Sequence, residues 1–125
     1  MIGSGVNTIF VVDDDQGILE SFDAMLGDDY PLVMIRDASK ALPMVSDSSP
    51  RLLFLDIKMP GMDGLEVLKE VKRINHEIDV VIITAYGTIE TAVEAIKVGA
   101  IDYITKPIEL DELLILVDRI AERRG

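Results

Sequence analysis

The feature that most constrains this chain is an apolar run that ends in one carboxylate and a turn. The run Leu52-Leu53-Phe54-Leu55-Asp56 is preceded by Pro50 and followed closely by Pro60-Gly61. An apolar run this short between turn-forming residues is typical of a strand that is buried on both faces. Asp56 then lies where the strand leaves the core. An aspartate there often only begins a turn, but the carboxyl ends of parallel strands are also where α/β proteins bind their ligands.

Four other apolar runs also predict strands, and helical patterns separate all of them. The predicted strands span residues 8–12, 32–35, 52–56, 80–84 and 101–104. These runs read more as continuous apolar stretches than as alternation, which is typical of a parallel sheet covered on both faces. Strands that alternate with helices predict an α/β fold, a three-layer α/β/α sandwich around a parallel sheet.

Each predicted strand is followed by apolar residues three and four positions apart, the spacing of an amphipathic helix. The residues that mark these helices are Ile18, Phe22, Met25 and Leu26; Ala38, Ala41, Leu42 and Val45; Leu65, Leu68, Val71 and Ile74; Ile89, Ala92, Val93 and Ile96; and Leu110, Leu113, Leu114 and Val117. Pro43 interrupts the second pattern, so with Ser39 as its cap we expect that helix to be short or distorted. Gly99 is expected to end the fourth helix.

Size, charge and cysteine content limit the classes of function. The chain has 125 residues, enough for one domain with its own core. We expect a flexible lead-in at residues 1–7, whose Gly3-Ser4-Gly5 is natural or a cloning remnant, and a single domain at 8–124. A formal net charge of −11 disfavours direct binding to nucleic acid. The sequence shows neither a membrane span nor a signal peptide, and the lack of cysteine fits a cytoplasmic location.

Reactive side chains stand at the ends of four predicted strands. In chain order they are Asp13, Asp14, Asp56, Thr84 and Lys106. If the sheet is parallel, all of them lie along one edge. An acid that caps the following helix would gain from the helix dipole, and this can explain Asp15. Neighbouring carboxylates, however, repel one another unless a cation lies between them.

This set of groups suits phosphoryl transfer. Carboxylates without histidine or cysteine favour Mg²⁺, which predicts a metal site at Asp13, Asp14 and Asp56. Asp56 is the predicted nucleophile and would become an aspartyl phosphate. Lys106 would neutralise a phosphoryl oxygen, and the hydroxyl of Thr84 would hydrogen bond to the phosphoryl group. Taken singly, Thr84 could bond only to backbone and Lys106 could be a solvated loop residue.

Nearly the whole chain resembles one family through four motifs. They are Phe10-Val11-Val12-Asp13-Asp14, Leu55-Asp56-Ile57-Lys58-Met59-Pro60-Gly61-Met62-Asp63-Gly64, Ile83-Thr84-Ala85 and Tyr103-Ile104-Thr105-Lys106-Pro107. Together they closely resemble the receiver domain of bacterial two-component response regulators. The resemblance implies a flavodoxin-like fold with strand order 2-1-3-4-5. It also implies that Asp56 accepts its phosphoryl group from the phosphohistidine of a sensor histidine kinase.

The resemblance further implies how the metal and the phosphoryl group are held. Asp14 and Asp56 would bind Mg²⁺ directly, together with the backbone carbonyl of Lys58, and Asp13 would act through water. Lys106 would contact the phosphoryl group, and its peptide bond to Pro107 would be cis, an arrangement nearly confined to proline. The charge of Lys58, so close to the phosphate, could alter dephosphorylation.

By the same resemblance, Thr84 and Tyr103 would form a switch. Thr84 would move toward the phosphate and Tyr103 would turn into the space left, although Tyr103 could also be an ordinary half-buried aromatic residue. The switch would change the face made by the fourth and fifth strands with their helices, where a receiver homodimer could form. Residues 85–92 look most like receivers of ATP-dependent enhancer-binding transcriptional activators. No output domain is present in this chain, so the domain either belongs to a longer transcription regulator or acts alone on a partner.

Three rival functions fit these residues less well. A flavodoxin would need a phosphate-binding loop at the place of Asp13-Asp14-Asp15, whose charge repels phosphate. A Mg²⁺-dependent phosphatase with an aspartyl nucleophile typically has a second aspartate where this chain has Lys58. A histidine phosphotransfer module would have to use His76, the single histidine, which looks like a solvated surface residue. We therefore expect a signalling domain rather than an enzyme.

Overall fold

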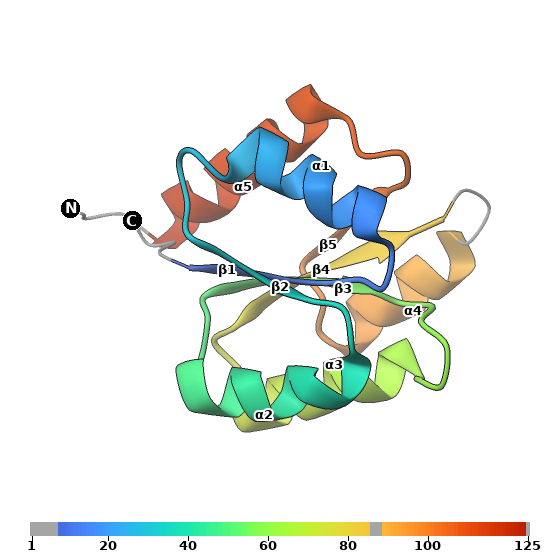
Figure 1. Ribbon diagram of the computed structural model, residues 1–125. Coiled ribbons are helices and arrows are strands. Elements are labelled where there is room, and N and C mark those ends of the chain that lie inside the picture. The colour runs from blue at the N-terminus through green and yellow to red at the C-terminus, as the bar shows by residue number, and fades with distance from the viewer. Residues whose placement is uncertain (1–7, 86–88, 125) are drawn as a thin grey trace.

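A computed structural model describes residues 8–85 and 89–124, so the expected lead-in at 1–7 lies outside the described residues. Strands and helices alternate along the chain (Figure 1). The strands are β1 (Ile9–Val12), β2 (Leu32–Ile35), β3 (Leu52–Asp56), β4 (Asp79–Thr84) and β5 (Asp102–Thr105). The helices are α1 (Gln16–Leu26), α2 (Ala38–Ser48), α3 (Gly64–Ile74), α4 (Ile89–Val98) and α5 (Leu110–Arg124).

The strands form one parallel sheet in the order β2-β1-β3-β4-β5. Helices α1 and α5 cover one face of this sheet, and α2, α3 and α4 cover the other (Figure 1). The three-layer sandwich and the strand order that the resemblance implied are therefore confirmed. The central strands β1, β3 and β4 are buried along their whole length, whereas the edge strands β2 and β5 are mostly half-buried.

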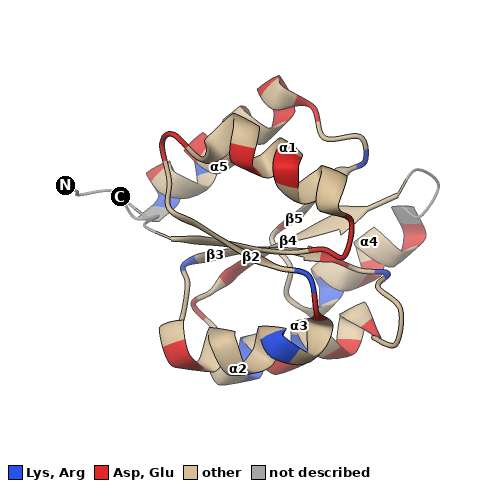
Figure 2. Cartoon of the chain, in the orientation of Figure 1, with Lys and Arg blue, Asp and Glu red and all other residues tan. Residues whose placement is uncertain are grey.

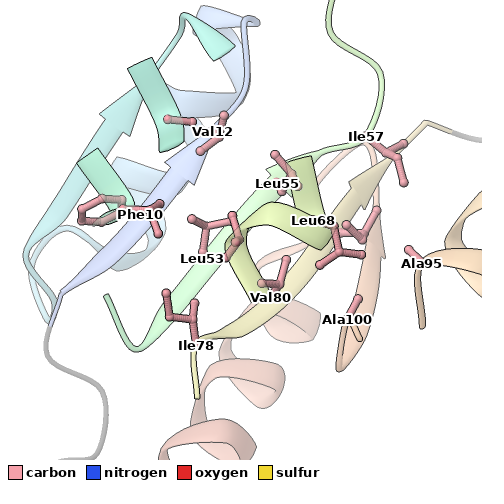
Figure 3. Close-up of a cluster of buried hydrophobic side chains, with 14 of the residues drawn as sticks. Phe10, Val12, Leu53, Leu55, Ile57, Leu68, Ile78, Val80, Ala95 and Ala100 are labelled. Carbon is pink, nitrogen blue, oxygen red and sulfur yellow. The ribbon is translucent and has the colours of Figure 1, made fainter. Parts of the chain in front are cut away.

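Two hydrophobic cores lie on the two faces of the sheet. Successive strand residues point to opposite faces, so each apolar strand contributes to both cores. The core under α1 and α5 includes Phe22 and Phe54, whose ring centroids are 4.8 Å apart. The core under α2, α3 and α4 contains Phe10, Leu55 and Leu68 among others (Figure 3). This double burial explains why the central strand sequences are mostly apolar.

Helix α2 differs from the expectation. Its cap is Asp37, whose side chain accepts a hydrogen bond from the Ser39 amide, so the prediction of Ser39 as the cap was wrong. Pro43 does not shorten the helix, which has 11 residues, as many as α1 and α3. The Pro43 ring lies on the exposed side of the helix, away from the core. The helix ends at Ser49, which adopts a left-handed φ of 45°.

Helix α4 is buried through small residues rather than through its large apolar ones. Ala92 and Ala95 are fully buried, but Val93 and Ile96 are 46% and 39% exposed. The helix ends at Gly99, as predicted, where the Gly99 amide donates to the carbonyl of Ala95 at 3.0 Å. A face of alanines lets a helix pack close to its neighbours. The apolar spacing predicted the helix correctly, but its large apolar side chains face outward.

The described residues include no helix with the length and hydropathy needed to span a bilayer. Charged residues occur on the helices and on the connections between elements (Figure 2). Acidic residues also occupy the connection from β1 to α1, at the carboxyl edge of the sheet (Figure 2). That edge is where the candidate site lies.

Candidate functional site

The carboxyl ends of four neighbouring strands supply the candidate site. Asp13 follows β1, Asp56 is the last residue of β3, Thr84 is the last residue of β4, and Lys106 follows β5. Because the strands are parallel and adjacent, these residues share one edge of the sheet. The register pairs Asp56 with Ile83, the residue before Thr84. The prediction that the sheet would gather these residues is confirmed.

Three carboxylates form a cluster that could hold a metal ion. One oxygen from each of Asp13, Asp14 and Asp56 lies within 4.8 Å of the others. Asp13 is fully buried and Asp56 is 5% exposed, whereas Asp14 is exposed and opens the cluster to solvent. Oxygen-only donor sets of this kind suit Mg²⁺. Among the described residues, no other such cluster occurs.

Asp13 has one buried oxygen that forms an ion pair with Lys106 but has no hydrogen bond within the described part of the chain. Its Oδ1 accepts a hydrogen bond from the Asp15 amide at 2.9 Å. Its Oδ2 is buried and accepts no hydrogen bond from the described residues. A buried carboxylate oxygen without a hydrogen bond is costly, and a bound cation or its hydration water would relieve that cost. The donor set therefore fits a hydrated divalent cation.

Lys106 is the cation that faces the buried carboxylates. Its Nζ forms an ion pair with Asp13 Oδ2 at 3.1 Å, donates a hydrogen bond to Asp13 Oδ1 at 3.5 Å, and lies 3.5 Å from Asp56 Oδ2. Burial lowers the pKa of the Lys106 ammonium, but the hydrogen bond and charge of Asp13 and the charge of Asp56 outweigh this effect, so the pKa is raised. The Lys106 amide donates to the carbonyl of Thr84 at 2.9 Å. The Lys106-Pro107 peptide bond is cis, as the resemblance implied.

Asp56 has the most perturbed acidity at the site. Burial raises its pKa from 3.8 to about 6; the hydrogen bond from the Lys58 amide opposes this change, the charge of Asp13 adds to it, and Lys106 opposes it. At neutral pH the Asp56 carboxyl group is therefore largely ionised, and the positive charge of Lys106 offsets its negative charge only in part. Strongly shifted carboxyl groups beside charged partners are typical of functional sites.

The connection after β3 orients the Asp56 carboxylate. The Lys58 amide donates to Asp56 Oδ1 at 3.1 Å, while the side chain of Lys58 is exposed. Sequence reasoning had assigned Lys58 through its carbonyl and had missed its amide. An aspartate often binds the amide two residues later in this way, so the bond could have been found from the sequence.

Thr84 and Tyr103 lie on the same face of the sheet. Tyr103 in β5 pairs with Ile82 in β4, and Thr84, two residues beyond Ile82, points to the same side. Thr84 is fully buried, and its hydroxyl donates to the Ala85 carbonyl at 3.4 Å. Tyr103 is half-buried and packs against the core under α2, α3 and α4. His76, the residue that the phosphotransfer alternative needs, precedes β4 at the opposite edge of the sheet.

Comparison with known proteins agrees with this architecture. The model of the response regulator receiver domain family matches residues 9–118. The chain is 42% identical over 118 residues to the transcriptional regulatory protein ZraR of Klebsiella oxytoca, covering 93% of this chain and 27% of that protein. It is 43% identical over 117 residues to the nitrogen assimilation regulatory protein NtrX of Azorhizobium caulinodans, covering 91% and 26%. The chain thus spans about a quarter of the length of these curated relatives.

Solved structures lead to the same family. The receiver domain of NtrX from Brucella abortus has a TM-score of 0.86 and 42% identity, with 91% of this chain and 98% of that chain covered. A CheY-like receiver domain protein from Methanospirillum hungatei has a TM-score of 0.87 and 28% identity, covering 95% and 96%. By its fold, its strand-end residues and these matches, the chain belongs to the response regulator receiver domain family, among relatives that include transcriptional regulators.

Proposed function

We propose that this receiver domain accepts a phosphoryl group on Asp56 from the phosphohistidine of a sensor histidine kinase, in a reaction that needs Mg²⁺. One observation carries the proposal: the buried Asp56 stands within a three-carboxylate cluster, with the Lys106 ammonium 3.5 Å from its Oδ2. The nucleophile, the metal ligands and a countercharge for the phosphoryl group thus share one edge of the sheet.

In the transfer step, an ionised oxygen of Asp56 attacks the phosphorus atom. The new O–P bond forms as the P–N bond of the donor histidine breaks, and the electron pair of that bond returns to the imidazole nitrogen, which takes up a proton. The pKa of about 6 leaves Asp56 mostly ionised at neutral pH, as a nucleophile must be. Lys106 offsets the negative charge that gathers on the phosphoryl oxygens.

The residues that would hold Mg²⁺ are Asp14, Asp56 and the carbonyl of Lys58, with Asp13 acting through water. The hydrogen bond that Asp13 Oδ2 lacks within the described residues supports this assignment, because a metal-bound water could donate to it. When bound, Mg²⁺ would neutralise the carboxylates and the incoming phosphoryl oxygens. The chain's own part is to hold the ligands at one edge and to leave Asp14 open to solvent.

Phosphorylation would then act as a conformational switch through Thr84 and Tyr103. Thr84 would turn toward the phosphoryl group and Tyr103 would move inward, which would change the face formed by β4, β5, α4 and α5. The shared sheet face of the two residues supports such coupling. The receiver, as one domain at 8–124 in the cytoplasm, would control an output domain that regulates transcription, or a partner protein if it acts alone.

The first test is the intact mass of the chain after incubation with acetyl phosphate, with and without Mg²⁺. We expect a gain of one phosphoryl group that needs the metal and is absent in Asp56→Asn. Asp63→Asn, a change to an exposed cap in the same connection, is the matched control and should still be phosphorylated. No gain in the unaltered chain would contradict the proposal.

A phosphatase with an aspartyl nucleophile is the enzyme alternative. Such an enzyme would hydrolyse a phosphate ester over many turnovers, whereas a phosphoacceptor stops after one phosphoryl group per chain and then loses it slowly. Release of more than one equivalent of phosphate from a small phosphate ester would support the phosphatase. We expect no such turnover, since the exposed Lys58 stands where those enzymes have their acid and base.

A further inference from the structure

Gly64 lies unusually close to the backbone beside Asp56. It is the buried first residue of α3. A Cβ atom on Gly64 would lie 2.7 Å from Ile57 Cα and 2.8 Å from Ile57 Cγ1, and closer still to the carbonyl oxygen of Ile57. Non-bonded carbon atoms pack best at about 3.5–4.0 Å, so these distances are too short. Any other residue at this position must therefore displace either α3 or the backbone that follows Asp56.

Ile57 cannot easily move away from such a contact. Its amide donates to the carbonyl of Ile83 in β4 at 3.2 Å. Its side chain is 5% exposed and belongs to the core under α2, α3 and α4 (Figure 3). Gly64 at the start of α3 lies directly against the backbone of Ile57. The backbone of Ile57 is thus held between β4, the core and the start of α3.

The start of α3 is itself well fixed. Oδ1 of Asp63 accepts hydrogen bonds from the amides of Leu65 at 3.0 Å and Glu66 at 3.4 Å. Leu68, one turn further along the helix, is fully buried. A side chain at Gly64 would therefore act on both segments that meet there, the start of α3 and the backbone of Ile57.

Ile57 connects Asp56 to Lys58, so its position sets the geometry of both. The Lys58 amide donates to Asp56 Oδ1 at 3.1 Å, and this bond leaves Asp56 Oδ2 facing Lys106 at 3.5 Å. A shift of a few tenths of an ångström in Ile57 would lengthen the first bond and move the Lys58 carbonyl. Both the orientation of the nucleophile and one metal ligand would change.

We propose that Gly64 is a positioning residue of the phosphoacceptor site: without a Cβ, it lets the start of α3 pack directly on Ile57 and so holds the Lys58 amide and carbonyl beside Asp56. The inference rests on the proposed function of Asp56. Gly61, in the same connection, offers a contrast, because its φ of +72° favours glycine while a Cβ there would meet no atom within 4 Å. Alanine at Gly61 strains its own backbone but does not push on Ile57.

The test compares Gly64→Ala with Gly61→Ala. Urea unfolding reports stability, the amide resonance and hydrogen exchange of Lys58 report the local bond without metal, and Mg²⁺ titration gives the Kd. Both variants should lose stability. Only Gly64→Ala should shift the Lys58 resonance and speed its exchange, weaken Mg²⁺ binding by about tenfold or more, as supporting residues of metal sites do, and slow phosphorylation by acetyl phosphate to a similar degree.

The outcomes separate this inference from the proposed function. Equal Mg²⁺ affinity in the two variants, or an unchanged Lys58 amide in Gly64→Ala, overturns the positioning role. If Gly64→Ala does not fold alone, the Lys58 amide is compared in the Asp56→Asn background, where the Asn oxygen still accepts its bond. If Gly64→Ala also fails to fold in the Asp56→Asn background, while Gly61→Ala folds, then Gly64 is needed only for folding. That result also overturns the inference. An unaltered chain that takes no phosphoryl group defeats the proposed function, whereas the Lys58 comparison still decides the role of Gly64.

Discussion

At the scale of single residues, the site combines two buried carboxylates with one partly exposed lysine. Asp13 and Asp56 both lie near the ammonium of Lys106, whose side chain is 23% exposed, and Asp13 Oδ2 accepts no hydrogen bond from the described residues. Burial is the largest cause of the raised pKa of Asp56. Without a bound cation, the ionised Asp56 carboxylate therefore opposes folding. The site is thus less stable without ligands than it would be with a bound metal ion and a phosphoryl group.

The first residue-scale prediction concerns Asp56→Asn without metal. The folded pKa of about 6 exceeds the ordinary 3.8, so between these values the folded chain binds more protons than the unfolded chain and its stability falls as pH rises. We expect Asp56→Asn to raise the free energy of unfolding by about 1–2 kcal/mol at pH 7.5 and hardly at all near pH 4. Urea unfolding in EDTA at the two pH values measures this gain.

The control for that experiment is Asp37→Asn at the exposed cap of α2. Hydrogen bonds from Ser39 hold the pKa of Asp37 below its ordinary value, so its ionised form favours the folded state. No gain is expected at neutral pH in this variant. An equal gain from Asp56→Asn at both pH values would show that packing, rather than charge, is responsible.

The second residue-scale prediction concerns Lys106→Met, which keeps the apolar stem and removes the ammonium. Lys106 supplies positive charge to the same oxygens that a metal would approach, at 3.1 Å from Asp13 and 3.5 Å from Asp56. We expect Mg²⁺ to bind about threefold to tenfold more tightly at pH 8, while phosphorylation by acetyl phosphate slows. Lys69→Met on the exposed side of α3 should change neither quantity. Weaker Mg²⁺ binding in Lys106→Met would mean that the lysine orders the ligands instead of competing with the ion.

At the scale of elements, α2 shows how a helix accommodates an unfavourable residue. Pro43 lies inside α2 and has no amide hydrogen to donate to the preceding turn. The helix still forms, because Asp37 caps it and because Ala41 and Val45 are buried against the sheet. Tertiary packing has outweighed local preference, which is common for helices in folded domains.

The prediction at this scale is that Pro43→Ala stabilises the domain. The exposed position means that no core contact is lost, and alanine supplies the missing hydrogen bond and a better helix propensity. We expect a gain of about 1–2 kcal/mol in the free energy of unfolding, measured by urea unfolding. Ser46→Ala, at another exposed position of α2, should gain only a few tenths of a kcal/mol. A loss in Pro43→Ala would indicate that the proline stabilises the chain by restricting its unfolded state.

At the scale of the whole molecule, large apolar side chains remain exposed on the two helices that flank the edge strand β5. Val93 and Ile96 lie on α4, and Leu110 and Ile115 on α5, with exposed fractions between 39% and 57%. Helix α4 packs against the core through Ala92 and Ala95, and its large residues Val93 and Ile96 remain exposed. The proposed switch would act at this same edge of the sheet, on β4, β5, α4 and α5.

The corresponding prediction is that phosphorylation promotes self-association through the face of β4, β5, α4 and α5. We expect the sedimentation coefficient to rise when Mg²⁺ and acetyl phosphate are added, and Ile115→Asp to abolish the rise while still being phosphorylated. Ser46→Asp adds the same charge to α2, beside the opposite edge of the sheet, and should behave as the unaltered chain does. Self-association that survives Ile115→Asp would place the interface on another face.

The sequence by itself determined the order of strands and helices along the chain and the chemical groups at the strand ends. Both are local: the apolar period and the turn residues act over a few neighbouring positions, and a parallel sheet brings all its carboxyl ends to one edge. From this, Asp13, Asp14, Asp56, Thr84 and Lys106 could be assigned to one site, and the structure places them there. Their individual roles stay predictions until the phosphorylation and metal-binding experiments are done.

Only the tertiary structure decided which faces are buried and how the site is held. Leu19 rather than Ile18 is fully buried in α1, and alanines rather than Val93 and Ile96 in α4, because neighbouring elements select the inner face from a broad apolar stripe. The ion pairs of Lys106 with Asp13 and Asp56 and the close approach of Gly64 to Ile57 depend on how separate elements pack against one another. Such distances arise between segments that meet only in the fold, so no local pattern in the sequence contains them.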